Sequence, residues 1–110
     1  MLNIIETRRS MEDTYEAISY DIVLDGATIG WASVIDGEGS PAYVERIDIE
    51  QAHRNHGHGS EALNALSDLY GGIIIAPDNE DAQRLYDRLG REYTGEVADY
   101  LDQGYGVYQI

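Results

Sequence analysis

The sequence contains no cysteine and no lysine, and no long apolar segment. Without cysteine the chain has no disulfide, no thiolate nucleophile and no thiolate metal ligand. No run reaches the about 18 consecutive apolar residues of a membrane span, and the N-terminal MLNIIETRRSMEDTYEA lacks the features of a secretory signal. We therefore expect a soluble, cytoplasmic protein that has no membrane partner.

Positive charge is also scarce. Seven arginines face 21 aspartates and glutamates, so the formal net charge is -14. Such a field repels nucleic-acid phosphates and attracts cationic partners, so no direct binding of nucleic acid is expected. The charge is compatible with simple solubility, with adaptation to a high-salt cytoplasm, or with a DNA mimic whose carboxylates imitate phosphates. Composition does not rank these three.

The first half of the chain has the alternating pattern of β-strands. We predict strands over residues 2–8, 14–24, 27–35 and 42–50. A charged turn over 9–13 separates the first two, and Asp25-Gly26 makes a hairpin of the next two. With 110 residues, 43% of them hydrophobic, the chain is expected to form a single domain over residues 1–110.

The second half has helical spacing. We predict a helix with Ser60 as N-cap that ends at Gly71-Gly72, a buried strand at IIIA, and a helix over 80–90 with Gly90 as its stop. The tail offers one ragged and one clear strand. The order β-β-β-β-α-β-α-β-β predicts an α/β (α+β) fold, a mixed sheet with an antiparallel N-terminal half and one β-α-β crossover.

The stretch HRNHGHGSEAL, residues 53–63, holds all three histidines and lies where a strand meets a helix N-terminus. Main-chain N–H groups at such a point have no helical partner, and they favour an anion, typically a phosphate. Gly57 and Gly59 let the backbone approach it closely, and Arg54 can add charge-assisted hydrogen bonds.

The same stretch has features of two other kinds of site. His53, His56 and His58 have ligand-like spacing for zinc, copper or nickel, but the glycines between them spread the side chains, and no metal is expected. The pattern Gly57-x-Gly59-x-x-Ala62, with Asp78 further on, is similar to a dinucleotide-binding fingerprint. That fingerprint begins directly at the strand end, whereas six residues separate Glu50 from Gly57 here.

The run YVERIDIEQAHRNHGHGSEALNAL resembles the acetyl-CoA-binding core of the GCN5-related N-acetyltransferases (GNAT). In that family a strand leads to R/Q-x-x-G-x-G/A at a helix start, here Arg54 to Gly59. The run GGIIIAPDNEDAQRLYDRLG is similar to the family's next strand, its asparagine and its A-x-x-L-Y-x-x-L-G helix, and GVYQI resembles the closing strand. The match covers roughly residues 20–110.

The resemblance implies an acyl-CoA-dependent N-acetyltransferase with acetyl-CoA as its cofactor. Backbone amides of the loop would hold the pyrophosphate, main-chain groups of the preceding strand would bind the pantetheine arm, and an asparagine would contact the cofactor. The residues so implied are Ile47, Ile49, Arg54, Asn55, His56, Gly57, His58, Gly59, Ser60 and Asn79.

The resemblance also implies two catalytic residues. Tyr86 matches the tyrosine often proposed to protonate the departing thiolate, and Glu45, in YVERI, is the candidate base that takes the proton of the amine. Each has a plain alternative: Glu45 as a solvated strand residue, Tyr86 as a core-facing aromatic and Asn79 as a helix cap.

Family members usually place two helices between their first two strands, and only about residues 9–14 lie there in this chain. We therefore expect an open acceptor site, suited to a protein or peptide, or completed by a second subunit in a homodimer. The expected acceptor is a cationic primary amine, from a polyamine-like molecule or a lysine of a basic protein, and it attacks directly. The alternative is a non-catalytic acidic binding protein or DNA mimic on the same fold.

Overall fold

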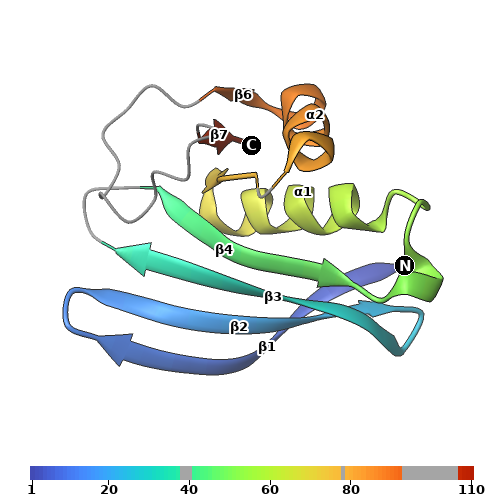
Figure 1. Cartoon of the computed structure of the whole chain (residues 1–110). Helices are drawn as coiled ribbons and strands as arrows, with labels where there is room; N and C mark the ends of the chain where they lie inside the picture. Colours follow the sequence, from blue (N-terminus) through green and yellow to red (C-terminus); the bar gives the residue numbers. More distant parts are fainter. Residues whose placement is uncertain (38–40, 78, 93–106) are drawn as a thin grey trace.

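Within the part of the chain that the structure describes, seven strands form one mixed sheet, and two α-helices pack on one face of it (Figure 1). The structure is a computed structural model that describes residues 1–37, 41–77, 79–92 and 107–110. The strands are β1 (Leu2–Glu12), β2 (Tyr15–Leu24), β3 (Ala27–Gly37), β4 (Ala42–Ile49), β5 (Ile73–Ile75), β6 (Arg91–Glu92) and β7 (Tyr108–Gln109). The helices are a 3-10 turn, η1 (Gln51–His53), and the α-helices α1 (His58–Tyr70) and α2 (Glu80–Leu89). Among the described residues, no helix is long and apolar enough to cross a membrane.

The strand order confirms the predicted mixed α/β fold. The order along the sheet is β1-β2-β3-β4-β5-β7-β6, and the first four strands are antiparallel to their neighbours. β4 and β5 run parallel, so α1 is the crossover of the predicted β-α-β unit. This parallel pairing covers only Ala42–Val44, and β4 then continues to Ile49 with β3 as its one strand partner in the described part of the chain. The opposite edge of β4 is therefore open after Val44.

One hydrophobic cluster holds the helices on the sheet. Side chains alternate between the two faces of a strand, so every second residue of β2 and β3 points toward the helices. The buried members include Ile18, Tyr20, Ala32 and Val34 from these strands, Leu63 and Leu66 from α1, and Tyr86 from α2. The helical spacing of the sequence predicts inward positions for Leu63, Leu66, Leu69 and Tyr86; three of them are buried as predicted, whereas the prediction is wrong for Leu69, which is 57% exposed.

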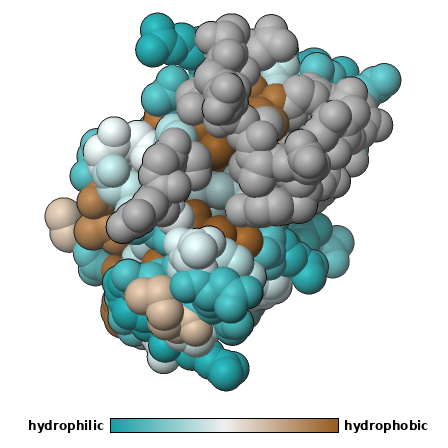
Figure 2. Space-filling view, turned by 90° about the vertical axis from the view of Figure 1, so that its left-hand side faces the viewer, coloured by the Kyte–Doolittle hydropathy of each residue, from teal (hydrophilic) through white to brown (hydrophobic). Residues whose placement is uncertain are grey.

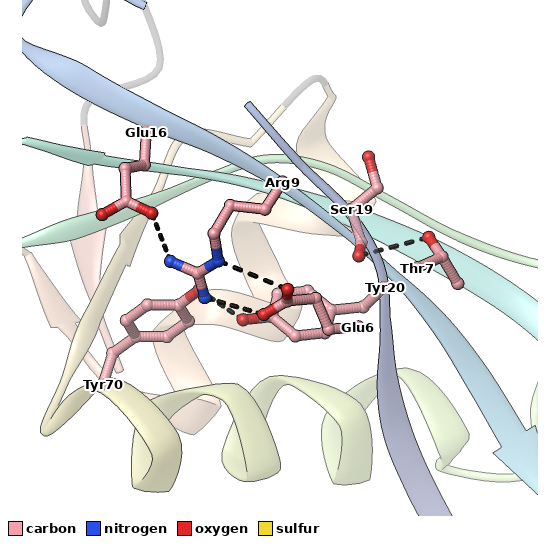
Figure 3. A network of polar contacts seen from close by, with 7 residues as sticks. All are labelled: Glu6, Thr7, Arg9, Glu16, Ser19, Tyr20 and Tyr70. Carbon is pink, nitrogen blue, oxygen red and sulfur yellow. Dashed lines mark hydrogen bonds and ion pairs between the residues drawn. The ribbon is translucent and has the colours of Figure 1, made fainter. Parts of the chain in front are cut away.

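β1 is longer than predicted: residues 9–12 of the predicted turn over 9–13 belong to the strand, and the turn consists of Asp13 and Thr14. Arg9 and Ser10 continue the ladder opposite Ile18 and Ala17. Charged residues are tolerated there because β1 is an edge strand, which leaves one side to water. Figure 3 shows the Arg9 guanidinium between two carboxylates: it donates to Glu6 at 2.7 Å and also to Glu16. No helix intervenes between β1 and β2, as expected for this chain.

Two tyrosines join β2 to the last turn of α1. The hydroxyls of Tyr20 and Tyr70 lie 2.5 Å apart, and their rings meet edge to face (Figure 3). Burial and this hydrogen bond raise the pKa of Tyr70, because both disfavour its phenolate. The contact ties the hairpin of β1 and β2 to the helix above it.

The C-terminal strands complete the sheet. β7 pairs with both β5 and β6. Gly90 ends α2 as predicted, and it lies so close to β7 that a Cβ there would stand 2.0 Å from the Gln109 carbonyl oxygen. The rest of the predicted ragged strand falls on residues 93–106, outside the described residues. On the side of the molecule seen in Figure 2, the coloured surface is mainly hydrophilic with small apolar areas, in keeping with the composition.

Candidate functional site

The N-terminus of α1 is built by glycine and is not capped by a side chain. Gly57 is the N-cap, with a φ of 79° that side chains rarely adopt, and the helix begins at His58. The predicted N-cap, Ser60, is wrong, because it lies inside the first turn. Since no side chain accepts from this turn, the N–H groups of His58, Gly59 and Ser60 have no partner within the helix. They can bind an anion.

Gly59 is not required by the protein's own packing. A Cβ built there would meet nothing within 4 Å, and glycine in a helix costs about 1 kcal/mol relative to alanine. The space in front of Gly59 is therefore free of the protein's own atoms and open to a ligand.

A cavity of about 390 Å³ opens in front of this helix end. Seven of the ten predicted cofactor residues line it: Ile49, Arg54, Asn55, Gly57, His58, Gly59 and Ser60. Ile49 closes the cavity at the end of β4, and the loop before α1 supplies the others. The structure therefore brings together residues that the sequence placed in one motif.

The other wall of the cavity comes from α2 and was not predicted. His53, Asp81, Leu85 and Arg88 complete the lining. The three α2 residues follow the i, i+4, i+7 spacing of one helix face, next to the core face of Tyr86. That spacing was visible in the sequence, but the packing of this face opposite the α1 N-terminus depends on the tertiary structure.

Hydrogen bonds of Arg54 connect the loop before α1 to the end of β4. Its Nε donates to the Ile49 carbonyl oxygen at 2.7 Å, and its Nη2 donates to Asp48 at 3.1 Å. At the helix start, His58 Nδ1 lies 3.1 Å from a Glu61 carboxylate oxygen. These contacts shape the loop, while the backbone N–H groups of the first turn face outward without partners in the helix.

Three predicted cofactor residues do not line the cavity: Ile47, His56 and Asn79. The Ile47 side chain packs against the core, and its expected role concerned its main chain on β4, beyond the short pairing with β5. The Asn79 side chain accepts a hydrogen bond from the Ala82 N–H at 2.8 Å, so it is the N-cap of α2. The alternative role of Asn79, a helix cap, is thus present in the structure.

The two predicted catalytic residues lie on different elements, and neither lines the cavity. Glu45 is exposed at an irregularity of β4, where Ser33 pairs with Arg46 but the next residue of β3, Val34, pairs with Val44. The strand leaves Glu45 outside the ladder, which is the arrangement of a β-bulge, and bulges often redirect a side chain. Tyr86 is 7% exposed, and its ring centre lies 6.3 Å from that of Tyr108.

The histidines are close but do not gather around a point. The rings of His56 and His58 are 5.9 Å apart, while His53 belongs to η1. Among the described residues, no group of three histidine, cysteine or acidic side chains could hold a metal ion. Asp78 of the dinucleotide interpretation lies outside the described residues.

The sequence model of the acetyltransferase (GNAT) family matches residues 4–90. The chain belongs to the GNAT family. No curated protein sequence matches it. The matched range includes the loop before α1 and every residue that lines the cavity.

Solved GNAT structures share the fold. A protein from Bacteroides thetaiotaomicron assigned to the family is 24% identical with a TM-score of 0.60, over 84% of this chain and 59% of that one. A Salmonella typhimurium acetyl transferase that modifies the N-terminal serine of a 50S ribosomal subunit protein is 22% identical with a TM-score of 0.62, over 86% and 63%. An Elizabethkingia anophelis GNAT acetyltransferase with acetyl-CoA bound is 14% identical with a TM-score of 0.59, over 86% and 75%. The chain thus spans less than two thirds of the length of the first two.

Proposed function

We propose that the chain is an N-acetyltransferase that uses acetyl-CoA as acyl donor and a cationic primary amine as acceptor. One observation carries the proposal: three N–H groups without helical partners open into the cavity at the motif that defines the family. The Elizabethkingia relative, of the same fold, binds acetyl-CoA.

The residues present fit this donor. A pyrophosphate is an anion with several acceptor oxygens, and the first turn of α1 offers His58, Gly59 and Ser60 N–H groups together with the positive end of the helix dipole. Because neither Gly57 nor Gly59 has a side chain and the space above both is empty, an anion can reach the backbone. The edge of β4 beyond Val44 can offer main-chain groups to an extended arm, up to the Ile49 carbonyl oxygen, which already accepts from Arg54.

When bound, acetyl-CoA supplies an acetyl group activated as a thioester. The amine nitrogen attacks the thioester carbonyl carbon, and the carbon–sulfur bond breaks. Glu45 takes the proton that the amine loses, directly or through water, and Tyr86 donates a proton to the departing sulfur. The chain has no cysteine, so a covalent thioester on the protein is excluded.

The negative charge of the chain favours a cationic acceptor. The formal charge of -14 attracts amines, and the sheet face opposite the helices carries no helix within the described residues. Such an open face suits a polyamine, a lysine of a basic protein, or an acceptor held jointly with a second copy of the chain. The Salmonella relative acts on a protein, which is one precedent for a macromolecular acceptor on this fold.

An acetyl-transfer assay tests the proposal. The protein is mixed with acetyl-CoA and, separately, with spermidine, a lysine-rich peptide and a glutamate-rich peptide, and the free thiol released is measured. We expect thiol release with the cationic acceptors and none with the acidic peptide. Binding of acetyl-CoA without transfer to any amine would contradict the catalytic part of the proposal.

A further inference from the structure

The α2 wall of the cavity holds a cation that the family motif does not explain. Arg54 and Arg88 are the two arginines in the lining. Arg54 is occupied by the Ile49 carbonyl and Asp48, whereas Arg88 forms no ion pair with any of the residues that the structure describes. Asp81, on the same wall, is paired with Arg84, so its charge is compensated.

Leu85 lies between Asp81 and Arg88 on this face and is half-buried. The wall therefore offers an apolar surface next to a cation, in the same cavity as a helix end that can bind an anion. Coenzyme A has the matching chemistry, because its nucleotide part carries a pyrophosphate, an adenine ring and a separate phosphate on the ribose 3′-oxygen. If the α1 N-terminus holds the pyrophosphate, the 3′-phosphate still needs a positive partner.

We propose that Leu85 and Arg88 form a subsite for the nucleotide end of the acyl donor, with Arg88 bound to the 3′-phosphate. This inference rests on the proposed function and extends it, because it assigns a second phosphate contact on the other wall of the cavity. A guanidinium binds phosphate oxygens through two parallel N–H groups, which a neutral side chain cannot do. The subsite makes the protein selective for coenzyme A over its 3′-dephospho form.

A structural role for Arg88 is the competing explanation. It lies in the last turn of α2, where a cation stabilises the negative end of the helix dipole. Such a role would affect the stability of the fold, and it would change the affinity for both forms of the ligand alike. The ratio of the two affinities therefore separates ligand contact from helix stabilisation, because the two ligands differ by one phosphate.

The test measures the dissociation constants of coenzyme A and 3′-dephospho-coenzyme A by calorimetry for four proteins: wild type, Arg88→Gln, Arg88→Lys and Arg91→Gln. Arg91→Gln is the control, since it removes the same charge from an exposed position just after α2 and outside the cavity lining, and it leaves the pair of Asp81 with Arg84 in place. We expect the wild type to prefer coenzyme A by about tenfold, which is the order of one charge-assisted hydrogen bond.

Arg88→Gln should bring that preference close to one, Arg91→Gln should leave it unchanged, and Arg88→Lys should keep part of it. Equal affinity of the wild type for the two ligands, or an unchanged preference in Arg88→Gln, would overturn the subsite and leave the proposed function intact. Failure of the wild type to bind either ligand would overturn both.

Discussion

Replacing Gly59 with glutamate should stabilise the protein and weaken binding of acetyl-CoA. Gly59 is the second residue of α1, and a side chain there meets open space. Glutamate is the better helix former by about 0.5–1 kcal/mol. Its negative charge in the first turn adds about 0.3–1 kcal/mol through the helix dipole. A gain of about 1 kcal/mol corresponds to an increase in Tm of about 4–8 °C for a domain of this size.

The same carboxylate opposes an anionic ligand. At about 5 Å from one phosphate charge, the repulsion costs roughly 1–3 kcal/mol for effective dielectric constants between those of water and a protein surface. Affinity for acetyl-CoA should therefore fall by about 5- to 150-fold. Gly57 is the poorer position for this test, because any side chain at a φ of 79° adds strain to the folded state.

Thermal unfolding and calorimetric titration on the same samples provide the assay. Gly59→Ala is the control: it should also raise the Tm, while its small neutral side chain, which the family motif accepts, should leave affinity within a few-fold of wild type. A Gly59→Glu protein that binds acetyl-CoA as tightly as wild type would refute the placement of a phosphate at this helix end.

Three further substitutions test the other parts of the account. Glu45→Gln should lower turnover at neutral pH, with a loss that shrinks at higher pH as more amine is already neutral; a pH–rate profile checks this, and a constant loss across pH would argue against a base. Tyr86→Phe keeps the buried ring, so it should reduce kcat more than the affinity for acetyl-CoA, and full activity in steady-state kinetics would remove the proton-donor role. Tyr70 has a raised pKa, so it favours the folded state below the ordinary tyrosine pKa of about 10 and this contribution is lost above it. Urea unfolding between about pH 8 and 11 should show a steeper loss for wild type than for Tyr70→Phe, and equal slopes would exclude the effect.

Much of the fold was predictable because local patterns determined it. The alternation in β2 and β3, the Asp25-Gly26 turn and the spacing of Leu63 and Leu66 all express contacts with a single core face. The end of β1 was missed because Arg9 and Ser10 look like turn residues in isolation. Their place in the strand depends on pairing with β2 and on the carboxylates of Glu6 and Glu16.

The candidate site likewise contains residues that a local pattern predicts and residues that only tertiary packing brings in. The loop residues Arg54 to Ser60 are contiguous, so one motif revealed most of them. The helix start was placed at Ser60 because serine is a common N-cap, whereas the left-handed conformation of Gly57 begins the helix earlier. Leu85 and Arg88 were not predicted as site residues. They line the cavity only because α2 packs opposite the loop, and no local sequence pattern shows how these two segments lie relative to each other.

Calorimetric titration of the wild-type protein with acetyl-CoA, beside NAD and zinc as controls, tests the central claim most directly. The account predicts saturable micromolar binding of one acetyl-CoA per chain, with no comparable binding of NAD or zinc. The absence of acetyl-CoA binding would contradict it. The fold would then lack its family's donor, and the acidic surface, whose binding to a basic partner weakens as salt rises, would become the functional feature.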